Sequence, residues 1–211
     1  KQKTKRGGIW YTPQSGIWQT VWAEHVPEGY IRSVLFTPEL PEGRIRWKLC
    51  AAQPKDAEIT ILYHGEAVAH GSADDDGCGS VVLPAGQLHL WSPETPELYD
   101  VTITLGKDTI KSYFAMRTVG TGKDEAGHPC LLLNGRPYFH HGVLDQGYWP
   151  DGLYTAPDDE ALVYDIQLMK SMGFNMLRKH IKIEPMRWYY HCDRLGMLVW
   201  QDMPSGGGSY H

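Results

Sequence analysis

The stretch Gly173-Phe-Asn-Met-Leu-Arg178 decides the second half of the chain, because it places a short apolar strand directly after a glycine stop. Before it, apolar residues recur at helical spacing in the order Ala161, Leu162, Ile166, Met169 and Met172. Thr155 is the expected cap of this helix, with Pro157 in the first turn and acidic residues after it. The pattern predicts a helix from about Thr155 to Gly173, followed by a strand from Phe174 to Leu177.

The alternation of strand and helix continues on both sides of that stretch. Pro137 to Leu144 is an apolar strand ahead of it, and Pro185 opens a second helix that stops at Gly196. Met197 to Trp200 forms a third strand. The order β-α-β-α-β requires parallel strands with right-handed crossovers. Because a parallel sheet needs both faces covered, we expect the incomplete beginning of an α/β barrel of the TIM type.

The first half of the chain has the two-residue period of half-buried strands. Ile45, Trp47 and Leu49, for example, are separated by charged residues. Short strands of this kind are expected at Tyr30–Thr37, Ile45–Leu49, Ile59–Tyr63, Val81–Leu83, Val101–Leu105 and Ile110–Met116. Turn-forming Pro, Gly and Asp stand between them. About seven short strands over roughly ninety residues predict an immunoglobulin-like antiparallel β-sandwich, with Trp47, Trp91 and Tyr99 in its core.

Composition narrows the classes of partner. The chain of 211 residues carries a formal net charge of −5, which argues against a nucleic-acid surface. No apolar run approaches the roughly 20 residues of a membrane helix. Four widely spaced cysteines fit neither a zinc site nor a disulfide scaffold, and we expect mostly buried free thiols in a reducing compartment. The interpretation is a protein without metal or cofactor, with a cytoplasmic location favoured.

Polar side chains follow each predicted strand of the second half. Asp145 and Gln146 follow the first strand, Arg178 and His180 the second, and Gln201 and Asp202 the third. In α/β barrels functional residues gather at the carboxyl ends of the strands. Donors and acceptors held there suit the hydroxyl groups of a polyol ligand, and the ring of Trp200 adds an aromatic face. The predicted substrate-binding residues are Asp145, Gln146, Arg178, His180, Trp200 and Asp202.

Structural roles for these residues compete with the functional ones. Arg178 could instead be a scaffold partner of Asp202 or Glu184, and His180 a satisfied buried group. Lys182 and Glu184 are interpreted as a pair at a helix start, and at least one of His140 and His141 as core. Glycoside hydrolysis requires two carboxylates about 5–5.5 Å apart in retaining enzymes, and nothing in the sequence marks such a pair among Asp145, Glu184 and Asp202.

Several stretches resemble glycoside hydrolase family 2, the β-galactosidase, β-glucuronidase and β-mannosidase group. Ser15-Gly-Ile-Trp-Gln-Thr-Val-Trp22 is similar to the end of that family's sugar-binding domain. Leu90-Trp-Ser-Pro-Glu-Thr-Pro-Glu-Leu-Tyr99 and Tyr113-Phe-Ala-Met-Arg117 resemble its immunoglobulin-like domain. Leu133-Asn-Gly-Arg-Pro-Tyr-Phe139 and Cys192-Asp-Arg-Leu-Gly-Met-Leu-Val-Trp-Gln-Asp202 are similar to the first and third strands of its catalytic barrel, with Gly173–Arg178 as the second.

The resemblance implies three domains. Residues 1–22 would be the end of a sugar-binding jelly-roll domain, residues 23–120 the sandwich, and residues 121–211 the first three strands and two helices of a TIM barrel. It also implies a retaining mechanism on β-glycosides, with the acid/base Glu after the fourth barrel strand and the nucleophilic Glu after the seventh. Neither of those strands is among the 211 residues. The chain alone is therefore predicted to lack catalytic residues and activity.

The resemblance also bears on individual residues. Arg178 matches the second-strand arginine near the nucleophile, and His180 lies close to the position of a substrate-contacting histidine. Galactosidases carry two residues between this Arg and His, and an Asn-Arg-His-Glu run where this chain has Val143-Leu-Asp-Gln146. Val199-Trp-Gln-Asp202 resembles the mannosidase-like members instead.

The alternative to an enzyme fragment is a non-catalytic β-sandwich, either a spacer or a carbohydrate-binding module. A binding module would display a row of exposed aromatic side chains. Self-association is a further expectation, because an open barrel segment from about Asn134 to Trp200 exposes strand edges. The N-terminal Trp10, Trp18 and Trp22 are expected to join that contact.

Overall fold

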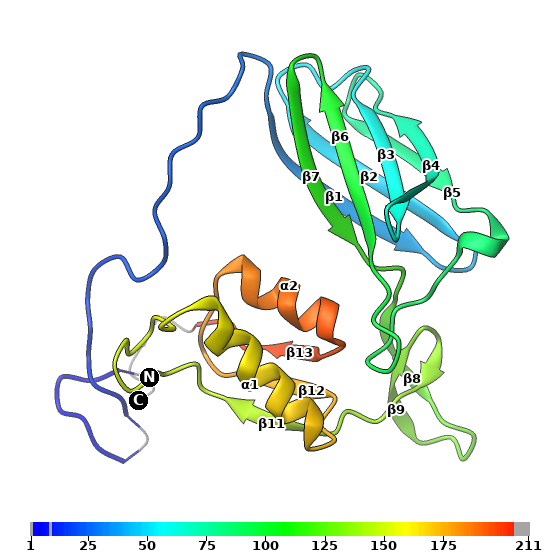
Figure 1. The fold of residues 1–211 in the computed structure, drawn as a ribbon. Coiled ribbons are helices and arrows are strands. Elements are labelled where there is room, and N and C mark those ends of the chain that lie inside the picture. The colour runs from blue at the N-terminus through cyan, green and yellow to red at the C-terminus, as the bar shows by residue number, and fades with distance from the viewer. Residues whose placement is uncertain (1, 9, 205–211) are drawn as a thin grey trace, which may run out of the picture. The chain divides into compact units, whose positions relative to one another are not determined.

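The computed structural model describes residues 2–8 and 10–204. The chain divides into two compact units (Figure 1). One unit consists of Ala23–Phe139, and the other combines the N-terminal segment Lys1–Trp22 with residues from His140 onward. The segment up to Trp22 therefore packs with a part of the chain more than a hundred residues away in sequence.

The first unit is built around a β-sandwich, as the alternating pattern predicts. One sheet has the order β1-β2-β5 and the other the order β4-β3-β6-β7, and all pairs are antiparallel. Their bounds are β1 Ile31–Glu39, β2 Arg44–Ala51, β3 Glu58–Tyr63, β4 Glu66–Ser72, β5 Cys78–Val82, β6 Tyr99–Leu105 and β7 Asp108–Phe114. The sequence analysis missed β4 and began β5 three residues too late.

The sandwich core consists of the inward-facing residues of both sheets. Ile45, Trp47 and Leu49 of β2 are at most 3% exposed, while the charged residues between them face solvent. Trp91 and Tyr99 are both fully buried, as predicted, but only Tyr99 belongs to the core cluster of the two sheets; Trp91 lies in the segment before β6 and outside that cluster. Trp47 fits because β4 carries a glycine beside it: a Cβ added to Gly71 would lie 2.4 Å from the Trp47 ring. Close packing of this kind leaves no room for a larger residue.

A small sheet of order β10-β9-β8 closes the first unit. Its strands are β8 Val119–Lys123, β9 Pro129–Leu133 and β10 Arg136–Pro137. The Asn134 Nδ2 donates to the Trp91 carbonyl at 2.9 Å, and the Asn134 Oδ1 accepts from the Thr118 N–H at 3.0 Å. These bonds join the small sheet to the segment that carries Trp91. Residues 121–139 thus lie in the unit of the sandwich, whereas the sequence analysis grouped them with the barrel segment.

The second unit contains a parallel sheet of order β11-β12-β13 with helices between the strands. The elements are β11 Gly142–Asp145, α1 Asp159–Ser171, β12 Met176–Lys179, α2 Met186–Leu195 and β13 Leu198–Gln201. This is the predicted β-α-β-α-β order. Leu162 and Ile166 of α1, Trp188 and Cys192 of α2, and Leu177 of β12 form its apolar core.

Three predicted details of the second unit are wrong. The helix α1 is capped by Asp158, whose side chain accepts from the Ala161 N–H at 2.7 Å, and Thr155 lies outside it. The first strand begins only at Gly142, because the chain at Pro137 still pairs in β10. His140 is half-buried and His141 exposed, so neither is a core residue.

The predicted end of α2 is confirmed. Gly196 caps the helix with a φ of 73°, a left-handed conformation that a residue without a Cβ adopts at little cost. No helix in the described part of the chain is long and apolar enough to cross a membrane.

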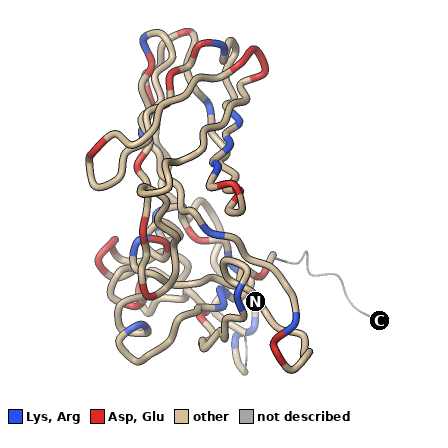
Figure 2. The backbone as a smooth tube through the Cα atoms, turned by 90° about the vertical axis from the view of Figure 1, so that its right-hand side faces the viewer, with Lys and Arg blue, Asp and Glu red and all other residues tan. Residues whose placement is uncertain are grey.

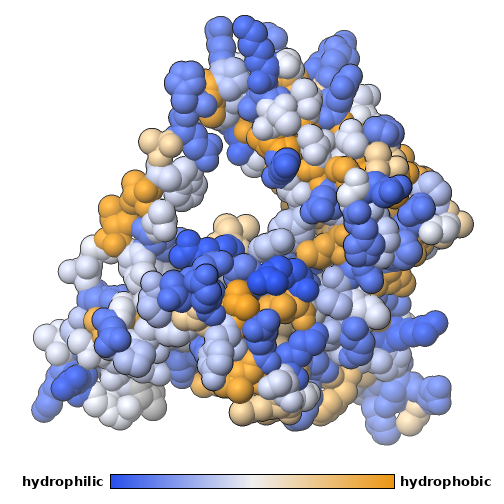
Figure 3. Space-filling model, in the orientation of Figure 1, coloured by the Kyte–Doolittle hydropathy of each residue, from blue (hydrophilic) through white to orange (hydrophobic). Residues whose placement is uncertain are grey.

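The surfaces of both units are mixed. Lys and Arg are interspersed with Asp and Glu along both units (Figure 2). Apolar residues also reach the surface on the face shown in Figure 3. The expectation of mostly buried thiols is wrong: Cys192 is buried, but Cys50 is exposed and Cys78 and Cys130 are half-buried.

Candidate functional site

The pleat of the parallel sheet separates two faces at the ends of its strands. Leu144, Arg178 and Trp200 are neighbours in register, and Leu144 and Trp200 remain 50% and 45% exposed. The next residue of each strand points to the opposite, helix-covered face. We call the side of Leu144, Arg178 and Trp200 the open face and the other side the helix face.

An ion pair joins two of the predicted site residues on the open face. The Arg178 Nε and Nη2 donate to the two carboxylate oxygens of Asp202, each at 3.0 Å. This bidentate bond holds the pKa of Asp202 below its usual value, with a smaller contribution from His180, and raises the pKa of Arg178. The scaffold partnership between Arg178 and Asp202 that the sequence analysis left open is therefore present.

Two further contacts order the open face. The His180 Nδ1 lies 2.8 Å from the Gln146 Oε1, which links the ends of β11 and β12. The Trp200 Nε1 donates to the His140 Nδ1 at 2.8 Å, so this histidine nitrogen is unprotonated. Burial lowers the pKa of His140, in agreement with a neutral ring. Five of the six predicted residues thus follow or end the three strands on this face.

Asp145, the sixth predicted residue, belongs to the helix face. Its Oδ2 lies 2.7 Å from the Lys179 Nζ, and its Oδ1 accepts from the Gly147 N–H at 2.8 Å. The Lys179 Nζ also lies 4.2 Å above the ring of Trp188 in α2. Asp145 and Gln146 are adjacent in sequence and therefore point to opposite sides of the sheet.

A cluster of charged side chains is buried on the helix face. Lys179, Lys182 and Glu184 are 1%, 1% and 4% exposed. The Glu184 Oε1 accepts from the Lys179 Nζ at 2.9 Å and lies 2.8 Å from the Lys182 Nζ. Burial lowers the pKa of Lys182, while the Glu184 carboxylate acts in the opposite direction. Lys182 and Glu184 do precede a helix, as predicted, but as a buried pair.

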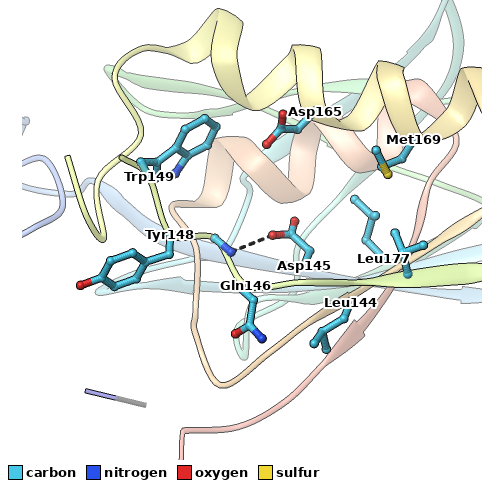
Figure 4. A pocket seen from close by; sticks show the side chains of 10 residues that line it. Leu144, Asp145, Gln146, Tyr148, Trp149, Asp165, Met169 and Leu177 are labelled. Atoms are coloured by element: carbon cyan, nitrogen blue, oxygen red, sulfur yellow. Dashed lines mark hydrogen bonds between the residues drawn. The ribbon is translucent and has the colours of Figure 1, made fainter. Parts of the chain in front are cut away.

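A cavity of about 260 Å³ lies beside β11 (Figure 4). Its walls come from β11, the turn after it, α1 and Leu177, with the carboxylates of Asp145 and Asp165 among them. Burial raises the pKa of Asp165, and the negative charge of Asp145 adds to the effect. Leu144 and Gln146 are the residues that the cavity shares with the open face.

The buried lysines and His140 were missed as parts of the site. A signal for Lys179 was available, because the two-residue period of a strand places it on the face opposite Arg178. No local pattern indicates that Lys182 turns inward, since its partner Gly147 lies 35 residues earlier in the chain.

The arrangement of these residues is suited to binding a ligand. Each of the three carboxylates is held by cations: Asp145 by Lys179, Asp202 by Arg178, and Glu184 by Lys179 and Lys182. In residues 2–8 and 10–204 no group of three or more His, Cys, Asp or Glu side chains could hold a metal ion. The open face instead presents amide, imidazole, guanidinium and indole groups in fixed positions, which suits a ligand rich in hydroxyls.

Known proteins resemble this chain over most of its length. Residues 29–117 match the model of the family described as glycosyl hydrolases family 2. A β-galactosidase 2 of Enterobacter cloacae is 32% identical over 206 residues, covering 88% of this chain and 20% of the relative. The chain thus spans about one fifth of the length of the curated relatives it matches.

Solved structures show the same fold. A β-glucuronidase of Faecalibacterium prausnitzii superposes with a TM-score of 0.73 at 26% identity, covering 84% of this chain and 28% of that one. A β-galacturonidase of Eisenbergiella tayi, solved with bound galacturonate, gives a TM-score of 0.66 at 24% identity, with coverages of 84% and 33%. The family match, the related sequences and the shared fold together place this chain in glycoside hydrolase family 2.

Proposed function

We propose that the chain is part of a retaining glycoside hydrolase that cleaves O-glycosidic bonds of β-glycosides, and that its open face contacts the carbohydrate. The observation that carries the proposal is the convergence of Gln146, Arg178, His180, Trp200 and Asp202 at the carboxyl ends of three parallel strands. That end of a parallel α/β sheet is where barrel enzymes bind their substrates.

The proposal assigns a domain to each part of the chain. Residues 140–202 would be the beginning of a TIM barrel, since β11, β12 and β13 are parallel and joined by helices. The sandwich of β1 to β7 would be the immunoglobulin-like domain, and residues 1–22 the end of a sugar-binding jelly roll. The order of these parts is that of the family resemblance.

The catalytic carboxylates lie, on this proposal, outside the 211 residues. A proton donor and a nucleophile must be free to exchange protons or attack carbon. Asp145, Glu184 and Asp202 are instead held by buried or bidentate cations. The isolated chain should therefore bind sugars without cleaving them.

Hydrolysis of a panel of aryl β-glycosides tests this proposal. The isolated chain should show no turnover, and the longer protein in its natural reading frame should hydrolyse at least one member of the panel. In that protein Arg178→Lys should lower kcat/KM at least about ten-fold, because a single amine cannot replace the bidentate guanidinium. Glu66→Gln, at an exposed position of β4, is the matched control. Turnover by the isolated chain that disappears on substituting one of its own carboxylates would refute the proposal.

Within this function the sandwich fits a spacer better than a carbohydrate-binding module. A module of that kind needs exposed aromatic rings, and Trp47, Trp91 and Tyr99 are at most 3% exposed.

Self-association of the isolated chain is also part of the proposal. In the described part of the chain β11 and β13 each pair on one side only, and apolar Leu144 remains half exposed on the same face as Trp200. Exposed strand edges recruit further strands. Light scattering over a range of concentrations should show an apparent mass that rises with concentration, and a constant monomer mass would contradict this part.

A further inference from the structure

The buried charges beneath the strand ends need an explanation other than stability. Lys179, Lys182 and Glu184 are nearly inaccessible, and their shared contacts run through one oxygen, the Glu184 Oε1. Removing such groups from water is costly, and buried ion pairs often contribute no more stability than apolar residues of the same size. A network of this kind is better explained by what it holds in place.

The network holds the chain on both sides of Gln146. On one side, the Lys179 Nζ lies 2.7 Å from the Asp145 Oδ2. On the other side, the Lys182 Nζ donates to the Gly147 carbonyl at 2.6 Å. Glu184 joins the two lysines. Gln146 is therefore the residue between two anchored neighbours, and its side chain points to the open face, where it meets His180.

Gly147 is the position where this anchoring requires a glycine. Its φ of +58° is one that residues with a Cβ rarely adopt. A Cβ at this position would lie 2.4 Å from the Glu184 Oε1 and 3.0 Å from the Lys179 Nζ. The missing side chain lets the charged cluster approach the backbone beside Gln146.

The N-terminal segment covers the cluster from outside. The Lys182 Nζ lies 5.0 Å from the ring centroids of both Trp18 and Tyr154, and both rings make cation–π contacts with it. The Thr155 Oγ1 donates to the Trp18 carbonyl at 2.8 Å, and the Gln19 Nε2 donates to the Ile183 carbonyl at 3.2 Å. Residues 18 and 19 are thus hydrogen-bonded to the loops after β11 and β12.

A strained backbone conformation occurs directly after His180. Ile181, directly after His180, has a φ of +51°, which is unfavourable for a β-branched residue. Such a conformation persists only when the surroundings enforce it. Ile181 lies between His180 on the open face and Lys182 in the cluster.

We infer that Trp18 and Lys182 are positioning residues: through the buried cluster, the N-terminal segment sets the geometry of the Gln146–His180 pair. The inference rests on the proposed carbohydrate contact of that pair. It assigns to a segment more than a hundred residues away in sequence a part in ordering the site, although neither Trp18 nor Lys182 belongs to the open face.

The position of the proton on the His180 ring provides a readout of this positioning role. The Gln146 Oε1 can only accept a hydrogen bond, so the 2.8 Å contact keeps the proton of a neutral His180 ring on Nδ1. If the loop around Gln146 loses its anchors, this bond breaks and the proton distributes between the two ring nitrogens.

The test is ¹⁵N NMR of the histidine rings in the 211-residue chain at about pH 8, where an unperturbed imidazole is neutral. Trp18→Leu removes the cation–π contact between Trp18 and Lys182. Lys182→Met independently removes the contacts of the Lys182 amine with Glu184 and Gly147, while keeping a side chain of similar length. Trp18→Phe restores an aromatic ring, and Trp10→Leu is the matched control, since Trp10 contacts Lys3 within the N-terminal segment. Each variant is measured well below its own unfolding temperature.

In Trp18→Leu and Lys182→Met the His180 nitrogens should lose the Nδ1–H pattern, and the Gly147 amide should exchange about ten-fold faster, as expected for one lost hydrogen bond. Trp18→Phe should restore both signals, and Trp10→Leu should leave them unchanged. Folded Trp18→Leu and Lys182→Met proteins with an unaltered His180 pattern would show that the cluster is structural only. Because no sugar is present, this result is independent of whether the glycosidase assay succeeds.

Discussion

The sandwich unit and the parallel-sheet unit bury different kinds of side chain. The sandwich core is a continuous set of apolar residues from both sheets. The buried charged side chains Lys179, Lys182 and Glu184, and the buried His191, all belong to the unit with the parallel sheet. The core of the first unit is apolar, whereas the second unit carries buried charges next to the open face. The contrast separates a unit with an apolar core from a unit that combines buried charges with the candidate site.

The largest expected effect is at a buried indole of the first unit. Trp91→Ala removes a fully buried indole, which typically costs about 3–5 kcal/mol in the free energy of unfolding. Chemical denaturation of the variant should show the loss, and Leu35→Ala, at a position 66% exposed on β1, should change the midpoint little. Equal midpoints for the two variants would mean that packing of this indole does not stabilise the first unit.

The buried cluster should be the next most sensitive place. Glu184→Gln leaves two buried lysines with one carboxylate fewer, and removing one partner of a buried ion pair usually costs about 3–5 kcal/mol. We expect a value near the lower end, because the amide oxygen can still accept from both amines. Chemical denaturation measures the loss. A neutral or stabilising effect would show that the lysines are satisfied without this charge.

A smaller effect tests the fit between β4 and Trp47. Gly71→Ala places a Cβ 2.4 Å from the Trp47 ring, and overpacking of this kind costs about 1–3 kcal/mol. Gly120→Ala in β8 is the matched control, because a Cβ added at Gly120 meets no atom within 4 Å. Thermal unfolding compares the two, and a Gly71→Ala protein as stable as the control would indicate that Trp47 moves aside freely.

The smallest effect concerns the exposed ion pair of the open face. The hydrogen bond from Arg178 lowers the pKa of Asp202 below the ordinary value of 3.8. Because the folded pKa is depressed, the contribution of the pair to stability is complete above about pH 3.8 and is lost as the pH falls through the lower, folded value. An NMR titration of the Asp202 carboxyl carbon should give a midpoint below 3.8, and Arg178→Gln should return it towards that value. A midpoint that does not respond to this change would exclude the pair in solution.

Periodicity predicted the regular elements for a physical reason. The residues of β2, β3 and β6 alternate between core and solvent, so their sequences alternate too. The strand β4 was missed because Glu66-Ala-Val-Ala-His-Gly-Ser72 has small residues on its buried side, where Trp47 fills the space. The spacing between Asp158 and Ala161 that caps α1 was outweighed by the Thr-Ala-Pro pattern upstream.

The candidate site was predictable in part. The rule that barrel sites gather at strand ends found the residues of the open face. The distinction between the two faces was lost, because Asp145 and Gln146 were taken together although a strand turns successive side chains to opposite sides. The roles of Lys182 and Trp18 depend on contacts between segments distant in sequence, and charge alone predicts exposure for a lysine.

We propose that the open face, and not the sandwich, contacts carbohydrate. The most direct measurement is a titration of the ¹⁵N-labelled chain with methyl β-glycosides, followed at the side-chain N–H groups of tryptophan and arginine. The account predicts saturable shifts at the Trp200 Nε1 and the Arg178 Nε, which lie on the open face, and constant signals from the buried Trp47 and Trp91. Saturable shifts at sandwich side chains with Trp200 and Arg178 unchanged, or no response to any glycoside of the panel, would contradict it.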